Sequence, residues 1–369
     1  MNTSSPLRIA VLGGALFGLR QPFAGGMESH TFDLVRGLRR RGHVVEVYVG
    51  PGSESPMDAI SMWDGAAPTS AAARRDVSSC PERVVGEHFA YQRTMLALAR
   101  RDDVDVVHLN GVHHLPVAMS PLLDCPVTAT LHCPPVPWLE LTHRELVRDD
   151  HPLDIVAVSR HLARSWQLAL GVPVATIENA VDLEVWQPGP GGGGYAAWSG
   201  RLVPEKAPHL AIEAARLAAL PIILAGPAHD PAYFAARVAP LLGTRATWVG
   251  PLGRPRLAEL FGRAEVTIVS SVWDEPFGLV AAESLACATP VATTGRGGLR
   301  DVVDADVGAH GSTDACELAD AIVAARTRSR RLCHARAVER FNIERMIDRY
   351  ERLLRDAAAR VTDSFVTVA

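Results

Sequence analysis

Short apolar segments alternate with longer helical patterns along almost the whole chain. The first segment, Leu7 to Leu12, ends at Gly13-Gly14, and a helical pattern from Glu28 to Arg41 follows it. An apolar run of about four to eight residues bounded by turn residues is typical of a buried strand. Strands that alternate with helices form parallel sheets with helices on both faces. The chain is therefore predicted to be an α/β protein.

The alternation continues in both halves of the sequence. In the first half we expect strands at 44–49, 104–109, 127–131 and 155–158, with a helix at 87–101. In the second half we expect strands at 196–199, 222–225, 247–249, 266–270 and 291–293, with helices at 208–220, 231–242 and 256–263. The tail from 315 to 359 has a helical pattern with a break at Phe341-Asn342.

A glycine- and proline-rich segment, Gln187 to Gly194, interrupts the pattern more strongly than any other stretch. Because 369 residues exceed one ordinary core, this segment is predicted to separate two domains. The predicted domains are 1–186 and 195–341, and the helix at 342–369 is expected to cross back to the first domain. Residues 51–81 are predicted to form a long loop, whose order the sequence does not decide.

The composition limits the classes of partner. A net charge of -4 argues against a nucleic-acid-binding protein, which needs a strongly basic surface. The chain has no apolar run long enough to span a bilayer, and its first six residues lack signal-peptide features, so we expect a cytoplasmic protein. The six cysteines form no C-x-x-C pair and are expected to be buried thiols.

A basic cluster ends the first predicted helix. It consists of Arg36, Arg39, Arg40 and Arg41. Two interpretations are open. The arginines could simply complement the helix dipole at a solvated helix end, or they could form a weak contact with an anionic membrane surface or acceptor.

The stretch from Trp273 to Pro290 carries the strongest chemical signal. Glu275 precedes Pro276, and a helix is predicted to begin near that proline, which leaves the N–H groups of Phe277, Gly278 and Leu279 to bind ligand oxygens. Glu283 lies eight positions after Glu275 among apolar residues, where a carboxylate needs hydrogen-bond donors such as a ribose diol. The alternative is an ordinary amphipathic helix with a solvated Glu283 and with Glu275 as a helix cap.

Lys206 is the only lysine in the chain, since 36 of the 37 basic residues are arginine. Such a bias is typical of a GC-rich genome, in which lysine codons become rare. A lysine that persists indicates a position that requires an ammonium group and not a guanidinium group. Chance survival is the alternative.

Polar residues follow the predicted strands of the first half. Asn110, His113 and His132 come after strand ends, where open parallel sheets bind ligands. With His108 and His114 these histidines could suggest a metal site, but no carboxylate lies at a ligand spacing, and we expect none. The two D-x-D strings, at 103–105 and 304–306, lie before a strand and in a late loop and are not expected to bind metal.

Together these residues resemble the retaining, metal-independent glycosyltransferases of the GT-B fold, in the large family that includes sucrose synthases and bacterial mannosyl- and glucosyltransferases. Several motifs in order carry the resemblance over nearly the full length: Gly25-Gly26-Met-Glu28, Arg40-Arg-Gly42-His43, Asn179-Ala-Val-Asp182, Gly200-Arg201 with Lys206, Glu275-x7-Glu283, and Gly297-Gly-Leu-Arg-Asp301. The resemblance implies two Rossmann-like parallel-sheet domains that face a central cleft. Ala180 and Asp301 depart from the usual glycine and glutamate, away from the chemistry.

The resemblance also implies roles for individual residues. Glu275 and the three amides that follow it would hold the donor sugar, and Glu283 the ribose. Arg201 and Lys206 would bind the pyrophosphate, with Gly25-Gly26 close to the same phosphates. His132 would lie beside the transferred sugar. From their positions at strand ends of the same domain, Asn110 and His113 are predicted to lie on the acceptor side. Fixed cations near the phosphates make chemical sense, because departure of a nucleoside diphosphate builds negative charge.

The predicted reaction is the transfer of a sugar, with retention of configuration, from a nucleotide sugar to a hydroxyl of a small soluble acceptor such as an inositol, an aminocyclitol or a secondary metabolite. A UDP-sugar is the expected donor, because UDP is the commonest donor nucleotide among members of the family. No metal or other cofactor is expected. The alternatives are an epimerase or hydrolase of the same fold, a lipid acceptor, or a binding protein without turnover. The sequence does not decide the oligomeric state.

Overall fold

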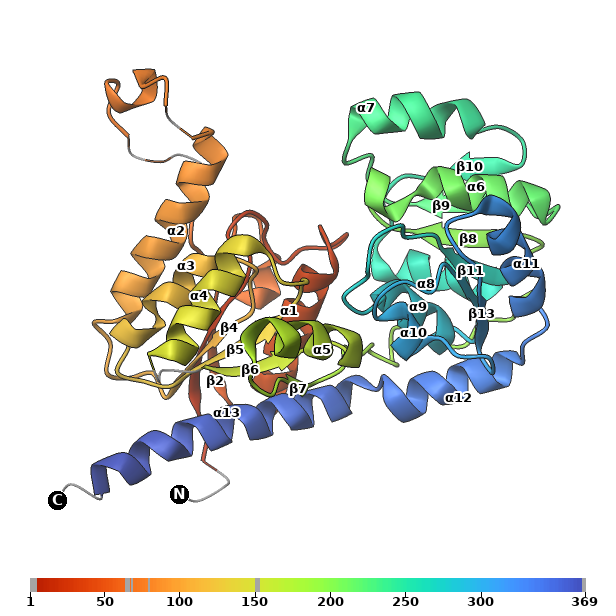
Figure 1. Cartoon of the computed structure of the whole chain (residues 1–369). Helices are drawn as coiled ribbons and strands as arrows, with labels where there is room; N and C mark the ends of the chain where they lie inside the picture. The colour runs from red at the N-terminus through yellow and green to blue at the C-terminus, as the bar shows by residue number, and fades with distance from the viewer. Residues whose placement is uncertain (1–4, 64–66, 68, 79, 150–152, 367–369) are drawn as a thin grey trace. The chain divides into compact units, whose positions relative to one another are not determined.

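A computed structural model describes residues 5–63, 67, 69–78, 80–149 and 153–366 (Figure 1). The chain forms two compact units. The first unit contains residues 1–157, 164–175 and 347–369, and the second contains residues 158–163 and 176–346. No helix within the described residues is long and apolar enough to cross a membrane.

The first unit is built on a seven-stranded sheet with the order β3-β2-β1-β4-β5-β6-β7. Its strands are β1 (Arg8–Leu12), β2 (Val44–Val49), β3 (Ile60–Ser61), β4 (Val106–Leu109), β5 (Val127–Leu131), β6 (Asp154–Ala157) and β7 (Ala175–Thr176). Strands β1 to β6 pair in parallel, and β1 lies between β2 and β4. The strand order reverses between β1 and β4, the point where open α/β sheets bind ligands.

Helices cover this sheet. They are α1 (Gly26–Arg40), α2 (Glu82–Leu98), α3 (His114–Met119), α4 (Pro137–Arg148), α5 (Arg160–Leu170), which begins in the second unit, and α13 (Ile343–Val366). Helices α2, α3 and α4 lie side by side (Figure 1). Helix α13 packs against α1, where a Cβ atom at Gly37 would meet the Ile347 side chain at 2.6 Å. A glycine there lets the two helices approach closely.

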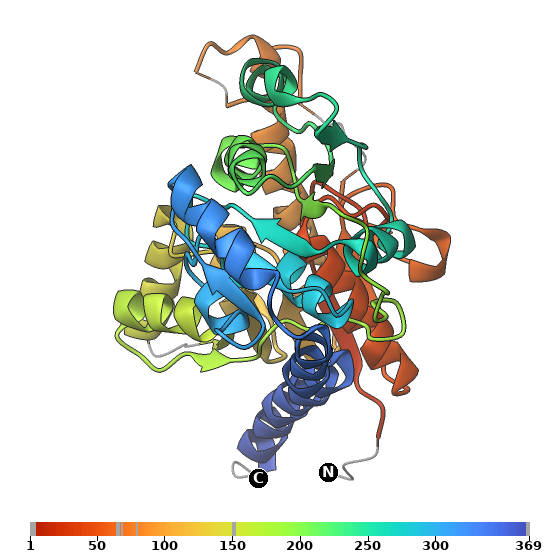
Figure 2. The same ribbon diagram turned by 90° about the vertical axis from the view of Figure 1, so that its right-hand side faces the viewer.

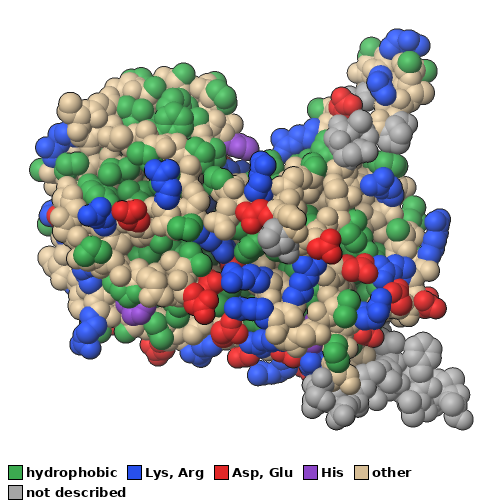
Figure 3. Space-filling model, turned by 180° about the vertical axis from the view of Figure 1, so that it is seen from behind, with side chains coloured by type: hydrophobic (Ala, Val, Ile, Leu, Met, Phe, Trp, Pro, Cys, Tyr) green, Lys and Arg blue, Asp and Glu red, His purple; other side chains and the backbone are tan. Residues whose placement is uncertain are grey.

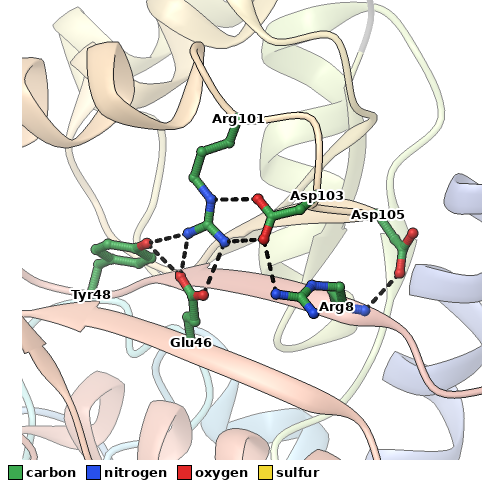
Figure 4. A network of polar contacts seen from close by, with 6 residues as sticks. All are labelled: Arg8, Glu46, Tyr48, Arg101, Asp103 and Asp105. Atoms are coloured by element: carbon green, nitrogen blue, oxygen red, sulfur yellow. Dashed lines mark hydrogen bonds and ion pairs between the residues drawn. The ribbon is translucent and has the colours of Figure 1, made fainter.

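An ion-pair network fixes the end of α2 to the sheet (Figure 4). The Arg101 guanidinium donates hydrogen bonds to Glu46 on β2 and to Asp103, and Asp103 also accepts one from Arg8 on β1. The Asp105 carboxylate accepts the backbone N–H of Arg8 at 2.7 Å. The carboxylates of the first D-x-D string therefore bind arginine and backbone groups.

The second unit is built on a six-stranded parallel sheet with the order β10-β9-β8-β11-β12-β13. Its strands are β8 (Ala196–Ser199), β9 (Ile222–Ala225), β10 (Ala246–Trp248), β11 (Val266–Val269), β12 (Val291–Thr293) and β13 (Gly308–His310). Counted within the unit, the order is 3-2-1-4-5-6, that of a dinucleotide-binding sheet. Its reversal lies between β8 and β11.

The helices of the second unit cover both faces of that sheet. They are α6 (Pro208–Leu217), α7 (Pro231–Tyr233), which continues as a π-helical turn over Phe234–Val238, α8 (Arg254–Arg263), α9 (Leu279–Ala286), α10 (Leu299–Val302), α11 (Ala315–Ala325) and α12 (Arg330–Arg340). Helices α6 and α11 lie side by side (Figures 1 and 2), and their buried side chains form one core with the sheet. Helices α8, α9 and α12 also pack together.

The glycine-rich segment belongs to the second unit and is fixed to it. The N–H groups of Gly189, Gly191 and Gly193 donate to the carbonyls of Cys287, Gly262 and Arg263. A Cβ atom at Gly189 would lie 2.3 Å from the Cα of Gly262. These glycines therefore allow two backbone segments to touch, although the composition of the segment alone predicts a linker. The longer part of the second unit begins before this segment, at Thr176, and ends at Met346.

Several local predictions differ from the structure. Helix α2 begins at Glu82 and not at 87, and helix α4 was not predicted. The segment 51–81 contains β3 and two 3-10 turns, with Met57 and Met62 buried in its described part. Cysteines 287 and 333 are buried, but Cys80 and Cys316 are exposed, so the prediction of six buried thiols is wrong.

The basic end of α1 has defined contacts of its own. The Arg39 guanidinium donates to the carbonyls of Val45 and Met57. Arg41 forms ion pairs with Asp348 and Glu351 on α13. These two arginines therefore connect α1 to its neighbours within the first unit. Figure 3 shows basic and acidic side chains interspersed on the face it presents.

Candidate functional site

The candidate donor site lies at the carboxyl ends of β8 and β11 in the second unit. Arg201 follows Gly200 directly after β8, and Lys206 ends a 3-10 turn over Pro204–Lys206. Glu275 lies in the loop between β11 and α9. The reversal of strand order places these two loops next to each other, because β8 and β11 are neighbours in the sheet.

Hydrogen bonds hold the lysine loop against the glutamate loop. The buried Ser270 hydroxyl, just after β11, bonds to the carbonyls of Lys206 and Ala207 at 2.9 Å. It also accepts the indole N–H of Trp198 at 3.0 Å. In addition, the N–H of Val272 donates to the carbonyl of Glu205 at 2.9 Å. The backbone of Lys206 is therefore fixed before any ligand binds.

Lys206 and Glu275 form an ion pair. The Nζ–Oε1 distance is 2.5 Å, and the Ser271 hydroxyl donates to the same oxygen. The Glu275 side chain is 7% exposed and that of Lys206 is 23% exposed. The Lys206 ammonium also lies 5.2 Å from the centre of the Trp273 ring, in a cation–π contact. Within the described residues, Oε2 of Glu275 makes no hydrogen bond or ion pair, so it can accept one from a ligand.

Helix α9 begins at Leu279 and not near Pro276, so that prediction is wrong by about one turn. The cause is Gly278, which precedes the helix with a φ of 99°, a conformation that L side chains rarely adopt. Glu275 therefore lies outside the helix that carries Glu283. Glu283 is on the helix and buried.

The loop before α9 still presents unused donors. Within the described residues, the N–H groups of Phe277, Gly278 and Leu279 donate no hydrogen bond. The Phe277 side chain points into the core, 2% exposed, with its ring 5.6 Å from that of Phe341. A Cβ atom at Gly297 would lie 2.5 Å from the carbonyl oxygen of Glu275, so a glycine is required there for the loops to meet.

Arg201 is less strongly held than Lys206. Its guanidinium lies 3.8 Å from Glu205, and both side chains are about two-fifths exposed at 39% and 40%. An exposed pair of this kind contributes little to stability. The Arg201 side chain can therefore change its orientation, whereas Lys206 is held by Glu275 and by its loop.

Two side chains, those of Ser159 and Asp301, fix the first residues of α5 to the rest of the second unit. The Ser159 hydroxyl donates to the carbonyl of Pro276 at 2.5 Å and accepts the N–H of Leu162 at 3.0 Å, so Ser159 caps the first turn of α5. The Asp301 carboxylate accepts the N–H of His161 at 2.8 Å. Asp301 therefore stabilises the positive end of a helix, a task that a carboxylate performs well.

The first unit carries a buried polar network at the carboxyl edge of its sheet. His132 follows β5, and its Nε2 atom lies 2.9 Å from Oδ1 of Asn110. Nδ2 of Asn110 donates to the hydroxyl of Thr31 at 2.8 Å and lies 3.1 Å from Nδ1 of His30. The Thr31 hydroxyl donates in turn to the carbonyl of Met27, so it can only accept from Asn110.

These contacts fix the tautomer of His132. Because Nδ2 of Asn110 faces the Thr31 hydroxyl, Oδ1 faces His132, and the His132 hydrogen must be on Nε2. Nδ1 of His132 is then an acceptor. Burial, together with the nearby His108, lowers the pKa of His132 to about 3, so the ring is neutral at pH 7. A neutral acceptor can receive a hydroxyl hydrogen of a sugar.

Asn110 is fully buried, and its amide is bonded to His30, Thr31 and His132. It therefore positions His132, and its predicted place on the acceptor side stays a prediction. Burial also lowers the pKa of His108 to about 4, and this ring is bonded to Thr128 and Thr130. Sequence reasoning missed His30 and Thr31, although their position just after the glycine pair was a usable signal.

The glycine pair opens α1. Gly25 is the residue before the helix, with an extended φ of -169°, and Gly26 is its first residue. A Cβ atom at Gly25 would lie 3.1 Å from the Glu28 carboxylate. His113 precedes α3 and packs with His88 and His114, apart from the network around His132.

Comparison with known proteins agrees with this architecture. The family model described as Glycosyltransferase Family 4 matches residues 24–185, and that described as Glycosyl transferases group 1 matches residues 188–329. The chain belongs to the family 4 glycosyltransferases of the GT-B fold. Glycosyl transfer is therefore its reaction class.

Relatives and solved structures extend the comparison. The D-inositol 3-phosphate glycosyltransferase of Mycolicibacterium paratuberculosis is 29% identical over 347 residues, 80% of this chain and 76% of that protein. The sucrose-phosphate synthase of Thermosynechococcus elongatus has a TM-score of 0.77 at 19% identity, covering 96% of this chain and 100% of that chain. Anabaena HepE in complex with UDP and glucose has a TM-score of 0.73 at 17% identity, covering 94% and 99%.

Proposed function

We propose that this family 4 glycosyltransferase moves a hexose from a UDP-sugar to a hydroxyl group of a small polyhydroxylated acceptor, with retention of configuration at the anomeric carbon. The observation that carries the proposal is the position of the Glu275 carboxylate and the contacts that hold it. Its carboxylate is buried at the strand-order reversal and is held through one oxygen by Lys206 and Ser271. Among the described residues, neither its other oxygen nor the N–H groups of residues 277–279 make a hydrogen bond. Such a site matches the many hydroxyl groups of a sugar.

The residues of this chain would act as follows. Glu275 Oε2 and the amides of Phe277, Gly278 and Leu279 bind and orient the donor sugar. Lys206, joined by Arg201, stabilises the charge that develops on the leaving diphosphate. The acceptor hydroxyl attacks the anomeric carbon while the bond to the phosphate oxygen breaks. Its proton passes to that phosphate oxygen, giving a glycoside and UDP.

Two observations support the choice of substrates. A solved structure of the same fold contains UDP and glucose, which favours a UDP-sugar donor. The relatives at 27–29% identity over most of the chain are named D-inositol 3-phosphate glycosyltransferases, which favours an inositol or a similar cyclic polyol as acceptor. We propose no cofactor and no resident metal for the transfer step, because Arg201 and Lys206 supply cationic charge.

The proposal is tested by ligand binding followed by product analysis. A nucleotide at 100 times its dissociation constant stabilises the folded protein by about 2.7 kcal/mol, so a panel of nucleoside diphosphates should single out UDP by its thermal shift. With a UDP-sugar and inositol or inositol phosphate, the coupling constant of the new anomeric proton should equal that of the donor. An inverted product would contradict retention. Free sugar as the main product would favour a hydrolase.

A further inference from the structure

A cluster of three histidines lies in the first unit, apart from the network around His132. His88 is on α2, His113 immediately precedes α3, and His114 is the first residue of α3. The ring centres of His88 and His113 are 4.5 Å apart, and those of His113 and His114 are 4.6 Å apart. One nitrogen from each of the three rings lies within 4.8 Å of the other two.

We propose that His88, His113 and His114 bind a divalent transition-metal ion of the zinc class. In a tetrahedral zinc site, bonds of about 2.0–2.1 Å place neighbouring nitrogens roughly 3.3 Å apart. The observed limit of 4.8 Å exceeds this by about 1.5 Å, which rotation of partly exposed rings can close. Three imidazoles without a carboxylate suit zinc, copper or nickel and do not suit magnesium or calcium.

The contact of His88 with the backbone supports ligation. Its Nδ1 atom lies 3.1 Å from the carbonyl oxygen of Val84, one helical turn earlier. A metal-binding histidine usually donates its second ring N–H to a carbonyl or carboxylate, which fixes the tautomer and leaves the other nitrogen for the ion. His88 therefore presents Nε2 as a ligand without any change of its backbone contact.

The metal-free cluster is also internally unsatisfied. Nδ1 of His113 accepts the N–H of Leu115 at 3.1 Å, so the His113 hydrogen is on Nε2. This Nε2 lies 3.4 Å from Nδ1 of His88, which also lies 3.1 Å from the Val84 carbonyl, so one nitrogen of His88 cannot satisfy both contacts. Ligation of a metal by Nε2 of His113 removes its hydrogen and with it this conflict. The His113 hydrogen then moves to Nδ1, where it faces the N–H of Leu115, so that bond is lost and the two groups must move apart.

Aromatic side chains hold two of the rings. The His114 ring stacks on Trp138 of α4 at 5.4 Å, and the His113 ring stacks on Tyr91 of α2 at 4.6 Å. The Tyr91 hydroxyl donates to the carbonyl of Gly13 and accepts the N–H of Ala15, in the loop after β1. A bound ion would therefore join α2 to α3 and, through Tyr91, stabilise the loop at the carboxyl end of β1. Its role is structural, and a fourth position is open to water.

The experiment is metal titration of the full chain after treatment with EDTA and dialysis. Calorimetry with Zn²⁺ should give about one equivalent per chain, and Co²⁺ should give a visible absorption band typical of a four-coordinate ion. Mg²⁺ is the negative control. His88→Gln and His114→Gln should each weaken Zn²⁺ binding at least tenfold, and His229→Ala, at an exposed histidine of the second unit, should not.

Circular dichroism and the melting temperature in EDTA establish that each variant is folded. His113→Ala provides a third variant if either glutamine substitution disturbs the fold. Zinc should raise the melting temperature of the wild-type protein and of His229→Ala, and it should not raise that of the cluster variants. Binding no tighter than that of Mg²⁺, or equal binding by the cluster variants and the wild-type protein, would overturn the proposal. Neither result depends on the donor or the acceptor, because no substrate is present.

Discussion

Replacement of Lys206 tests the proposed mechanism most directly. In Lys206→Met the stem keeps its length beside Trp273, but the ammonium that lies 2.5 Å from Glu275 is lost. If this ammonium stabilises the leaving diphosphate, its loss should raise the barrier by about 2–4 kcal/mol, as loss of one preorganised donor does. At 1.36 kcal/mol per factor of ten, this corresponds to a roughly 30- to 1000-fold lower kcat.

Lys206→Arg tests whether a positive charge suffices at this position or whether the compact shape of an ammonium group is also required. Arginine keeps a positive charge beside Glu275, but its wide planar group differs from the compact ammonium of lysine. The loop is fixed through Ser270, so the backbone cannot easily move to accommodate the larger group. We expect a substantial fall in kcat with little change in melting temperature. The solitary lysine of an arginine-rich chain would then reflect a chemical requirement.

Stability provides an internal control. Removing one partner of a buried ion pair costs about 3–5 kcal/mol, but Lys206 is 23% exposed and Ser271 still donates to Glu275, so we expect about 1–2 kcal/mol for Lys206→Met. Arg201→Ala removes only an exposed pair and should cost less than about 1 kcal/mol.

The assay measures release of UDP at saturating donor and acceptor, together with calorimetric binding of UDP. A wild-type kcat in Lys206→Met would refute the assignment of Lys206 to the leaving group. A wild-type kcat in Lys206→Arg alone would mean that charge suffices and that the lysine is an accident of codon usage.

Three other predictions follow from the site. Glu275→Gln should abolish transfer with nearly unchanged UDP affinity, whereas Glu283→Ala should weaken UDP binding, and equal losses of affinity would contradict the two assignments. Transfer should persist in EDTA even where the histidine cluster has lost its ion, and recovery of lost turnover on addition of Mg²⁺ would show a missed metal requirement. The free energy of unfolding should fall as the pH drops from about 6.5 to 4, because the unfolded state protonates its histidines at about 6.5 while burial holds the pKa of His108 at about 4. At pH 5 this histidine alone should cost about 2 kcal/mol, measurable by urea titration, and an equal pH dependence in His108→Gln would assign the effect elsewhere.

Local apolar patterns were sufficient to predict most strands of the two sheets, but not the short edge strands β3, β7 and β13. The runs that become β1, β4, β5, β8 and β11 are short, apolar and bounded by turn residues, which together favour buried strands over helices. Their carboxyl ends were also predictable, because parallel strands in an α/β sheet share one direction. This is why Asn110 and His132 were correctly expected at strand ends.

Contacts between distant residues could not be predicted in the same way. The segment at 187–194 has the composition of a linker, yet its backbone is bonded to Gly262 and Arg263, some seventy residues later. Pro276 has the composition of a helix start, yet the positive φ of Gly278 delays α9 to Leu279. His88 joins His113 and His114 only because α2 packs on α3. In each case tertiary packing overrides a local preference.

The pairing of Lys206 with Glu275 is another contact between distant residues that the sequence did not predict, and it affects how the two substitutions should combine. The sequence resemblance assigned these two residues to different parts of the donor, the diphosphate and the sugar, but the structure joins them through one oxygen. Residues in direct contact are not expected to have additive effects. Lys206→Met removes the charged partner of Glu275 Oε1 and leaves Ser271 as its donor, and Glu275→Gln removes the countercharge of the ammonium. The double variant should therefore lose less activity than the product of the two single losses. Strict additivity in a double-mutant cycle would mean that the ion pair is absent when the donor is bound, with each residue acting on its own part of the ligand.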